Sequence, residues 1–109
     1  MHTQQFLEML EKIKETILDV VNVRFIYLYG SHAYGVPTES SDIDIYIVLP
    51  DNSERISDIY TKIIYDLSKK KIFYVDLLLN KESVFAVRQR ENILESTITK
   101  KGMILYEQC

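Results

Sequence analysis

The sequence predicts an α/β (α+β) fold, in which a small mixed β-sheet is covered on one face by helices. The chain has 109 residues, 47% of them hydrophobic, a length and apolar content typical of one globular domain. Segments with helical spacing alternate with short runs rich in β-branched and aromatic residues. The resulting order of helix, strand, strand, helix, strand and helix favours a sheet packed against helices.

Three segments carry the helical pattern. Apolar residues at steps of three and four predict a helix over 5–21 and a second over 53–68, with Asp51, Asn52 and Ser53 as candidate N-caps. The segment 81–101 is predicted to form one or two helices that end at Gly102.

Three runs are predicted to be strands, and a fourth is a candidate edge strand. Residues 25–29 (FIYLY) form a buried run that stops at Gly30. Residues 42–49 (DIDIYIVL) alternate strictly at the start, and this run ends before Pro50. Residues 72–79 (IFYVDLLL) are apolar except for Asp76, and residues 103–106 are the candidate edge strand.

Composition excludes several classes of protein. Thirteen Lys and Arg against sixteen Asp and Glu give a net charge of −3, so we expect no general nucleic-acid coat protein and no stable direct binding of nucleic acid. The single cysteine, Cys109, can form neither an intramolecular disulfide nor a Cys-based zinc site. The chain has no signal-peptide pattern and no apolar run of about 18 residues, so a reducing, cytoplasmic setting without membrane contact is expected.

The most informative segment is GSHAYGVPTESSDID, residues 30–44. Two of its acids, Asp42 and Asp44, are one residue apart at the start of a predicted strand, so both side chains project from the same face about 6.5 to 7 Å apart at the backbone. Two carboxylates held together repel each other unless a cation lies between them, and hard oxygen ligands suit Mg²⁺. The pair is therefore a candidate magnesium site.

Asp76 and the Gly30-Ser31 turn extend this candidate site. An acid inside the run IFYVDLLL is costly to bury without a partner, and three carboxylates converge if that strand lies beside the strand of Asp42. Glycine lets a backbone approach a phosphate closely, and the Ser31 hydroxyl adds a hydrogen-bond donor. Together these residues suit a triphosphate with a metal ion.

Each signal has a structural alternative when taken alone. The Asp-x-Asp pair is also typical of a solvated loop edge, and Gly-Ser marks many turns. Asp76 alone is equally consistent with the end of a strand or with the ion-pair partner of a lysine. The combination, in this order and spacing, is far more specific than any one part.

Gly30, Ser31, ten further residues and then Asp42-Ile43-Asp44, followed by Asp76 in FYVDLLL, resemble the motif of the nucleotidyltransferases of the DNA polymerase β superfamily. The likeness is strongest to the minimal nucleotidyltransferases, and the ending KKGMILYE is similar to that of the family. It covers nearly the whole chain and implies a single domain over 1–109 with the polymerase-β-type nucleotidyltransferase core.

The resemblance implies that a nucleoside monophosphate is transferred from a triphosphate, usually ATP, with Mg²⁺ and release of pyrophosphate. Gly30 and Ser31 would hold the β and γ phosphates, and Asp42 and Asp44 would coordinate two metal ions. Asp76 would bind metal on the acceptor side and help deprotonate the attacking hydroxyl.

The chain departs from the family near the turn, where many relatives carry a basic residue and this sequence has His32 and Tyr34. His32 is either a triphosphate contact or a surface turn histidine. The spacing of Gly30 and Gly35 also fits the start of a P-loop, but Val36 and Pro37 follow where Lys and Ser or Thr would be needed, so a P-loop is rejected.

The resemblance also implies a partner. Minimal nucleotidyltransferases are typically encoded beside a HEPN-domain RNase toxin, and the likeness extends to antitoxins that adenylylate a toxin tyrosine. Since larger relatives carry a helical acceptor domain that we do not expect here, the acceptor site is expected to come from another molecule. Three functions stay open: a protein adenylyltransferase, a non-catalytic antitoxin that masks its partner, and a homodimer that modifies a small molecule such as an aminoglycoside. The oligomeric state and the roles of Arg88 and Arg90 are also open.

Overall fold

The computed structural model describes residues 3–38 and 41–108. Glu39 and Ser40 of the motif-bearing segment lie outside the described residues, as does Cys109. The described residues form the following elements in chain order: α1 (Gln4–Val20), β1 (Phe25–Tyr29), α2 (Ser31–Tyr34), β2 (Ile43–Leu49), α3 (Ile56–Lys69), β3 (Val75–Lys81), α4 (Glu82–Glu91), α5 (Ile93–Lys101) and β4 (Met103–Glu107).

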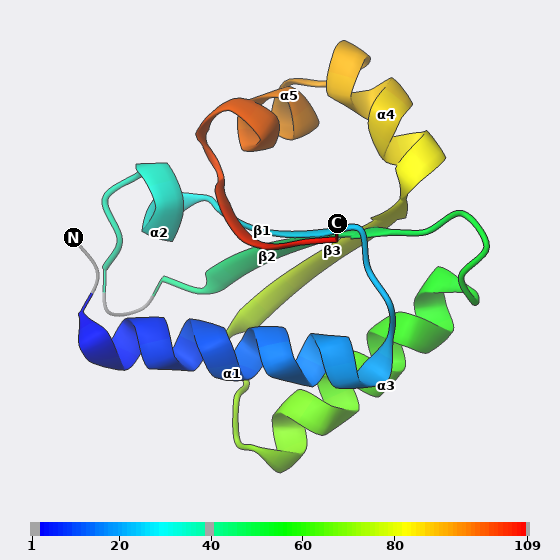
Figure 1. Ribbon diagram of the computed structural model, residues 1–109. Helices are drawn as coiled ribbons and strands as arrows, with labels where there is room; N and C mark the ends of the chain where they lie inside the picture. Colours follow the sequence, from blue (N-terminus) through cyan, green and yellow to red (C-terminus); the bar gives the residue numbers. More distant parts are fainter. Residues whose placement is uncertain (1–2, 39–40, 109) are drawn as a thin grey trace.

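The strands form one mixed sheet in the order β3-β2-β1-β4 (Figure 1). β1 pairs antiparallel with both β2 and β4, whereas β2 and β3 run parallel. The parallel pair is connected through α3, as such a crossover requires. The mixed sheet, the edge strand at 103–106 and the α/β class are therefore confirmed.

Helices α1 and α3 cover one face of the sheet, as the sequence predicts (Figure 1). The alternation along β2 turns every second side chain toward them, and these are all buried: Ile43, Ile45, Ile47 and Leu49. Helices α4 and α5 pack over part of the opposite face, which the sequence did not indicate. There they cover a second, smaller apolar cluster that includes Tyr46, Phe85 and Ile98.

Helices α1 and α3 differ in how their first turns are capped. Helix α1 starts beside Thr3, whose side chain accepts a hydrogen bond from the Phe6 amide at 3.1 Å. The predicted cap of α3 is wrong, because that helix follows Arg55 and has no side-chain cap. Asp51 instead accepts a hydrogen bond at 3.0 Å from the amide of Ser83, in the first turn of α4.

The predicted strand over 72–79 begins three residues later than expected, at Val75. The chain leaves α3 through Lys71, which has a left-handed φ of 62°, and the Ile72 amide still donates to the carbonyl of Leu67 at 3.0 Å. Ile72 therefore packs into the core as part of the helix ending, while Phe73 is 72% exposed. The apolar run in the sequence thus joins a helix cap and a strand.

Among the described residues, no helix is long and apolar enough to cross a membrane.

Candidate functional site

The turn after β1 brings the backbone against a carboxylate. Gly30 has φ 73° and ψ −154°, and its carbonyl accepts hydrogen bonds from the amides of Ala33 and Tyr34 at 3.0 and 3.1 Å. These bonds form the short helix α2, where the sequence predicts a loop. A Cβ at position 30 would lie 2.2 Å from Oδ2 of Asp44. Only glycine fits a turn that is both left-handed and this close to the acid.

The sheet register brings two of the predicted acids side by side. β2 and β3 pair in parallel with Asp44 directly beside Asp76, and Asp44 is also opposite Tyr29 on β1. Since neighbouring positions in register share a face, Asp44, Asp76 and Tyr29 project from the same side of the sheet. This is the face opposite α1 and α3. Asp42 is exposed and lies just before β2.

The electrostatics of this face agree with a cluster of like charges. Burial raises the pKa of Asp44, and the negative charges of Asp76 and Asp42 raise it further, while His32 lowers it. Burial also raises the pKa of Tyr29, with Asp44 and Asp76 adding to the shift. The charges of both other predicted acids therefore act on Asp44.

The donor set fits a divalent cation in its chemistry, because carboxylate oxygens are the hard ligands that Mg²⁺ prefers and a cation would relieve the repulsion at Asp44. Within residues 3–38 and 41–108, however, no group of three or more His, Cys, Asp or Glu side chains is arranged to hold a metal ion. Mg²⁺ usually uses one or two carboxylates and takes its other ligands from phosphate and water. Asp42, Asp44 and Asp76 as metal ligands stay a prediction.

Ser31 and His32 extend the site along α2. Ser31 is half-buried at the first position of that helix, next to Gly30. The His32 ring stacks on Phe6 of α1 with ring centroids 4.8 Å apart, and its Nε2 lies 3.2 Å from the carbonyl oxygen of Ser41. These two contacts hold the His32 side chain in a fixed position beside the acids.

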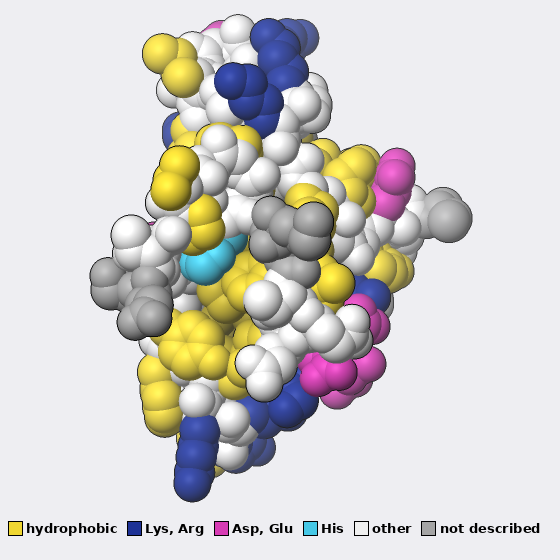
Figure 2. Space-filling view, turned by 90° about the vertical axis from the view of Figure 1, so that its left-hand side faces the viewer, with side chains coloured by type: hydrophobic (Ala, Val, Ile, Leu, Met, Phe, Trp, Pro, Cys, Tyr) yellow, Lys and Arg dark blue, Asp and Glu magenta, His cyan; other side chains and the backbone are white. Residues whose placement is uncertain are grey.

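An open hollow of about 410 Å³ adjoins this end of the sheet. Its lining combines rings and short polar side chains: Phe6, His32, Thr38, Ser41, Asp42, Ile43 and Tyr74. Figure 2 views this end of the molecule and shows hydrophobic side chains around the cyan histidine. The hollow thus offers an apolar surface directly beside one of the predicted metal ligands.

Sequence reasoning missed a buried polar network on the same face. The carboxylate of Glu95, 1% exposed, accepts hydrogen bonds through Oε2 from the Tyr46 hydroxyl at 2.9 Å and from Nε of Arg88 at 2.6 Å. Asn80 donates in turn to the Tyr46 hydroxyl at 2.8 Å. The one signal in the sequence is the acid of Glu95 between apolar neighbours in NILESTI, and this pattern is too common to predict a network.

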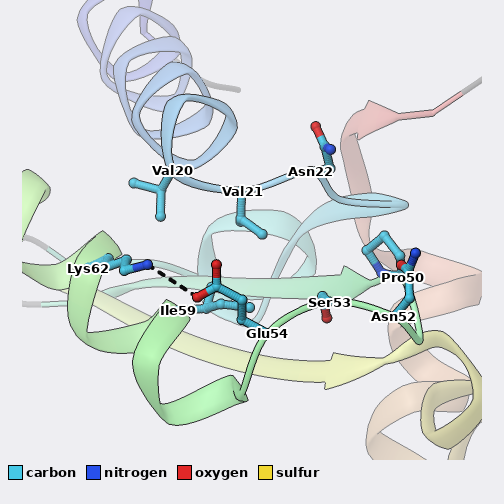
Figure 3. Close-up of a pocket in the computed structure, with 9 residues that line it drawn as sticks. All are labelled: Val20, Val21, Asn22, Pro50, Asn52, Ser53, Glu54, Ile59 and Lys62. Atoms are coloured by element: carbon cyan, nitrogen blue, oxygen red, sulfur yellow. Dashed lines mark hydrogen bonds and ion pairs between the residues drawn. The ribbon is translucent and has the colours of Figure 1, made fainter.

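A second hollow, of about 360 Å³, lies at the far end of β2, after Pro50 (Figure 3). It is lined by the end of α1, the loop after β2 and the start of α3, and the exposed ion pair of Glu54 and Lys62 at 3.2 Å lies beside it. None of Asp42, Asp44 and Asp76 lines it. This second hollow is therefore separate from the acidic face, the side of the sheet that carries Asp44 and Asp76.

Comparison with known proteins shows which family the chain is similar to. A model of the family described as "Nucleotidyltransferase domain" matches residues 10–99. A protein of Methanocaldococcus jannaschii named "Putative protein adenylyltransferase" is 35% identical over 91 residues, which cover 84% of this chain and 90% of that protein.

Two solved structures share the fold. One, described as "a putative nucleotidyltransferase" from Sulfolobus solfataricus, has a TM-score of 0.59 and 22% identity, covering 94% of this chain and 83% of its own. Another, described as a toxin-antitoxin with AMP-PNP, has a TM-score of 0.62 and 23% identity, covering 91% of this chain and 73% of its own. With the family match over most of its length and a curated relative of 35% identity, this chain belongs to the nucleotidyltransferase domain family.

Proposed function

We propose that this nucleotidyltransferase transfers AMP from ATP, with Mg²⁺, to a hydroxyl group of a protein acceptor, and that the acceptor is a tyrosine of a HEPN-type RNase toxin that is thereby silenced. The observation that carries the proposal is the in-register pair of Asp44 and Asp76, with Gly30 packed against the carboxylate of Asp44. Two acids and a turn whose glycine leaves room for a phosphate therefore lie together on the face of the sheet that α4 and α5 cover only in part.

In this proposal the chain acts as a single catalytic domain over 1–109. Gly30 and Ser31 bind the β and γ phosphates, where the absence of a side chain at position 30 lets the backbone approach. Asp42 and Asp44 would hold Mg²⁺, with two ions in the full complex. A bound Mg²⁺ would neutralise phosphate charge and stabilise the transition state of the transfer.

Asp76 is exposed on the edge strand β3, and in this proposal the acceptor approaches from its side. The acceptor hydroxyl oxygen forms a bond to the α-phosphorus, and its proton passes to the Asp76 carboxylate. The bond from the α-phosphorus to the oxygen bridging to the β-phosphate breaks, and pyrophosphate leaves with the electron pair. AMP is then esterified to the acceptor.

Two comparisons support the nucleotide and the partner. The similar toxin-antitoxin structure was obtained with AMP-PNP, an analogue of ATP, and the M. jannaschii relative carries the name of a protein adenylyltransferase. Action on a cytoplasmic toxin, in a complex of the two chains, also belongs to the proposal. The toxin partner rests on the toxin-antitoxin structure, and the cytoplasmic setting rests on the sequence alone.

The test incubates the purified protein with α-³²P-ATP, Mg²⁺ and the product of the neighbouring gene, in parallel with Asp42→Asn and Asp76→Asn. Glu54→Gln serves as the matched control, because Glu54 is an exposed acid beside the hollow at the far end of β2. We expect label on the partner with the parent and with Glu54→Gln, and none with the two aspartate variants.

The alternatives give different results. A complex that forms equally with parent and variants, with no label on the partner, would support the non-catalytic antitoxin and overturn the transferase proposal. Label on an added aminoglycoside without any protein partner would support the small-molecule enzyme instead.

A further inference from the structure

The buried carboxylate of Glu95 is poorly explained by stability alone. Its Oε2 accepts two hydrogen bonds, but Oε1 is buried and has no hydrogen-bond partner among the described residues. Removing a carboxylate from water is costly, and apolar replacement of buried ion pairs is often neutral or stabilising. A charged group at this position is therefore better explained if it holds neighbouring side chains in place.

The network of Glu95 joins four elements above the acidic face. Tyr46 comes from β2, Asn80 from β3, Arg88 from α4 and Glu95 from α5. Tyr46 is two residues beyond Asp44, so both side chains project from one face of the sheet. Asn80 stands four residues beyond Asp76 and shares the same face. The network therefore anchors the α4–α5 hairpin to the two strands that carry the acids.

The Tyr46 ring connects this network to the site. It is fully buried and meets the rings of Phe85 and Tyr29 edge-on, with centroid distances of 5.3 and 6.3 Å. Tyr29 is directly opposite Asp44 and immediately precedes Gly30. The hydrogen bonds of the Tyr46 hydroxyl with Asn80 and Glu95 thus hold the Tyr46 ring in place. That ring packs against Tyr29, which lies between Asp44 and the Gly30 turn.

The charge of Glu95 suits a permanent link. Burial by itself would raise the pKa of Glu95, but the hydrogen bonds from Arg88 and Tyr46 outweigh it and leave that pKa below its usual value. The carboxylate is therefore available to accept both hydrogen bonds at neutral pH.

We infer that Glu95 is a positioning residue for nucleotidyl transfer: its carboxylate holds the Tyr46 ring, and through Tyr46 and Tyr29 it fixes Asp44 against the Gly30 turn. This inference rests on the transfer reaction proposed above. Small displacements of reacting groups slow a reaction by large factors. Loosening the contact between Asp44 and the Gly30 turn therefore lowers kcat more than it lowers the affinity for the nucleotide.

The test compares Glu95→Gln and Tyr46→Phe with Ile98→Val. Ile98 is a fully buried residue of α5 in the same apolar cluster, and removing one of its methyl groups disturbs packing without touching the network. Three quantities are measured for each protein: the melting temperature, the amide NMR spectrum without metal or nucleotide, and kcat and KM for ATP well below the melting temperature.

We expect both network variants to shift or broaden the amide signals of Tyr29, Gly30 and Asp44, which Ile98→Val leaves in place. We also expect kcat of both network variants to fall about tenfold or more, while their KM for ATP stays within about twofold of the parent value. In Ile98→Val we expect no such fall in kcat. The double variant should show little further loss, because both changes break one link.

The inference is overturned if the network variants only lower the melting temperature, with site amides and kcat like those of Ile98→Val. A parent protein that transfers no nucleotide would refute the proposed function, and the amide signals would then still decide whether Glu95 positions Asp44 and Gly30.

Discussion

Replacing Gly30 with alanine tests the reasoning about the phosphate turn most directly. The native φ of 73° and ψ of −154° belong to a region that residues with a Cβ rarely adopt. The new Cβ would also lie 2.2 Å from Oδ2 of Asp44 and 3.1 Å from its Cγ. Gly30→Ala therefore combines backbone strain with displacement of a candidate metal ligand.

The two effects can be given magnitudes. A non-glycine residue in this backbone region costs about 1 to 3 kcal/mol. Turning the Asp44 side chain out of its preferred rotamer adds about 1 kcal/mol. A total of about 2 to 4 kcal/mol is a large part of the roughly 5 to 15 kcal/mol that stabilises a typical domain. For a chain of this size it corresponds to a fall in melting temperature of roughly 8 to 16 °C.

The assay is urea unfolding of Gly30→Ala, of Asp44→Ala and of the double variant, without metal. Asp44→Ala removes the carboxylate that the new Cβ meets, so in that background Gly30→Ala should cost only the backbone part, about 1 to 3 kcal/mol. A cost below about 0.5 kcal/mol in the parent background would refute the backbone argument. Equal costs in both backgrounds would refute the contact with Asp44.

Asp44→Asn should equal or exceed the parent in metal-free stability at pH 7, because burial and the charges of Asp76 and Asp42 raise the Asp44 pKa and so disfavour the charged form on folding. The advantage should vanish as the pH falls through that raised pKa toward 3.8, where the parent carboxyl is neutral too, as urea unfolding at pH 7 and pH 3.5 would show. Ile63→Ala, at a fully buried position of α3, should lower the free energy of unfolding by about 2 to 5 kcal/mol, and a loss under 1 kcal/mol would contradict its place in the core. Asp51→Ala should speed amide hydrogen exchange at Ser83, whose N–H donates to the Asp51 carboxylate, and unchanged exchange would show that this hydrogen bond does not form in solution.

Much of the candidate site could be predicted from the sequence because its signals are local. The alternation over β2 places Asp44 on the face opposite Ile43 and Ile45, and the glycine before Ser31 marks a turn that needs a positive φ. The pairing of Asp44 with Asp76 was expected only on the condition that the two strands are neighbours. The parallel register confirms that condition.

The sequence by itself determined the acids, the turn glycine and the apolar stripes of α1 and α3, since each depends on residue type and spacing along one segment. The tertiary structure alone decided where β3 begins. Ile72 is apolar because it packs into the core at the end of α3, and not because it belongs to the strand. It also decided that α4 and α5 lie over the acidic face. Helix α4 has apolar residues on several sides and no clear stripe to predict its direction. The partners of Glu95 come from positions 7 to 49 residues away, and only the folded chain brings such distant groups within hydrogen-bond reach.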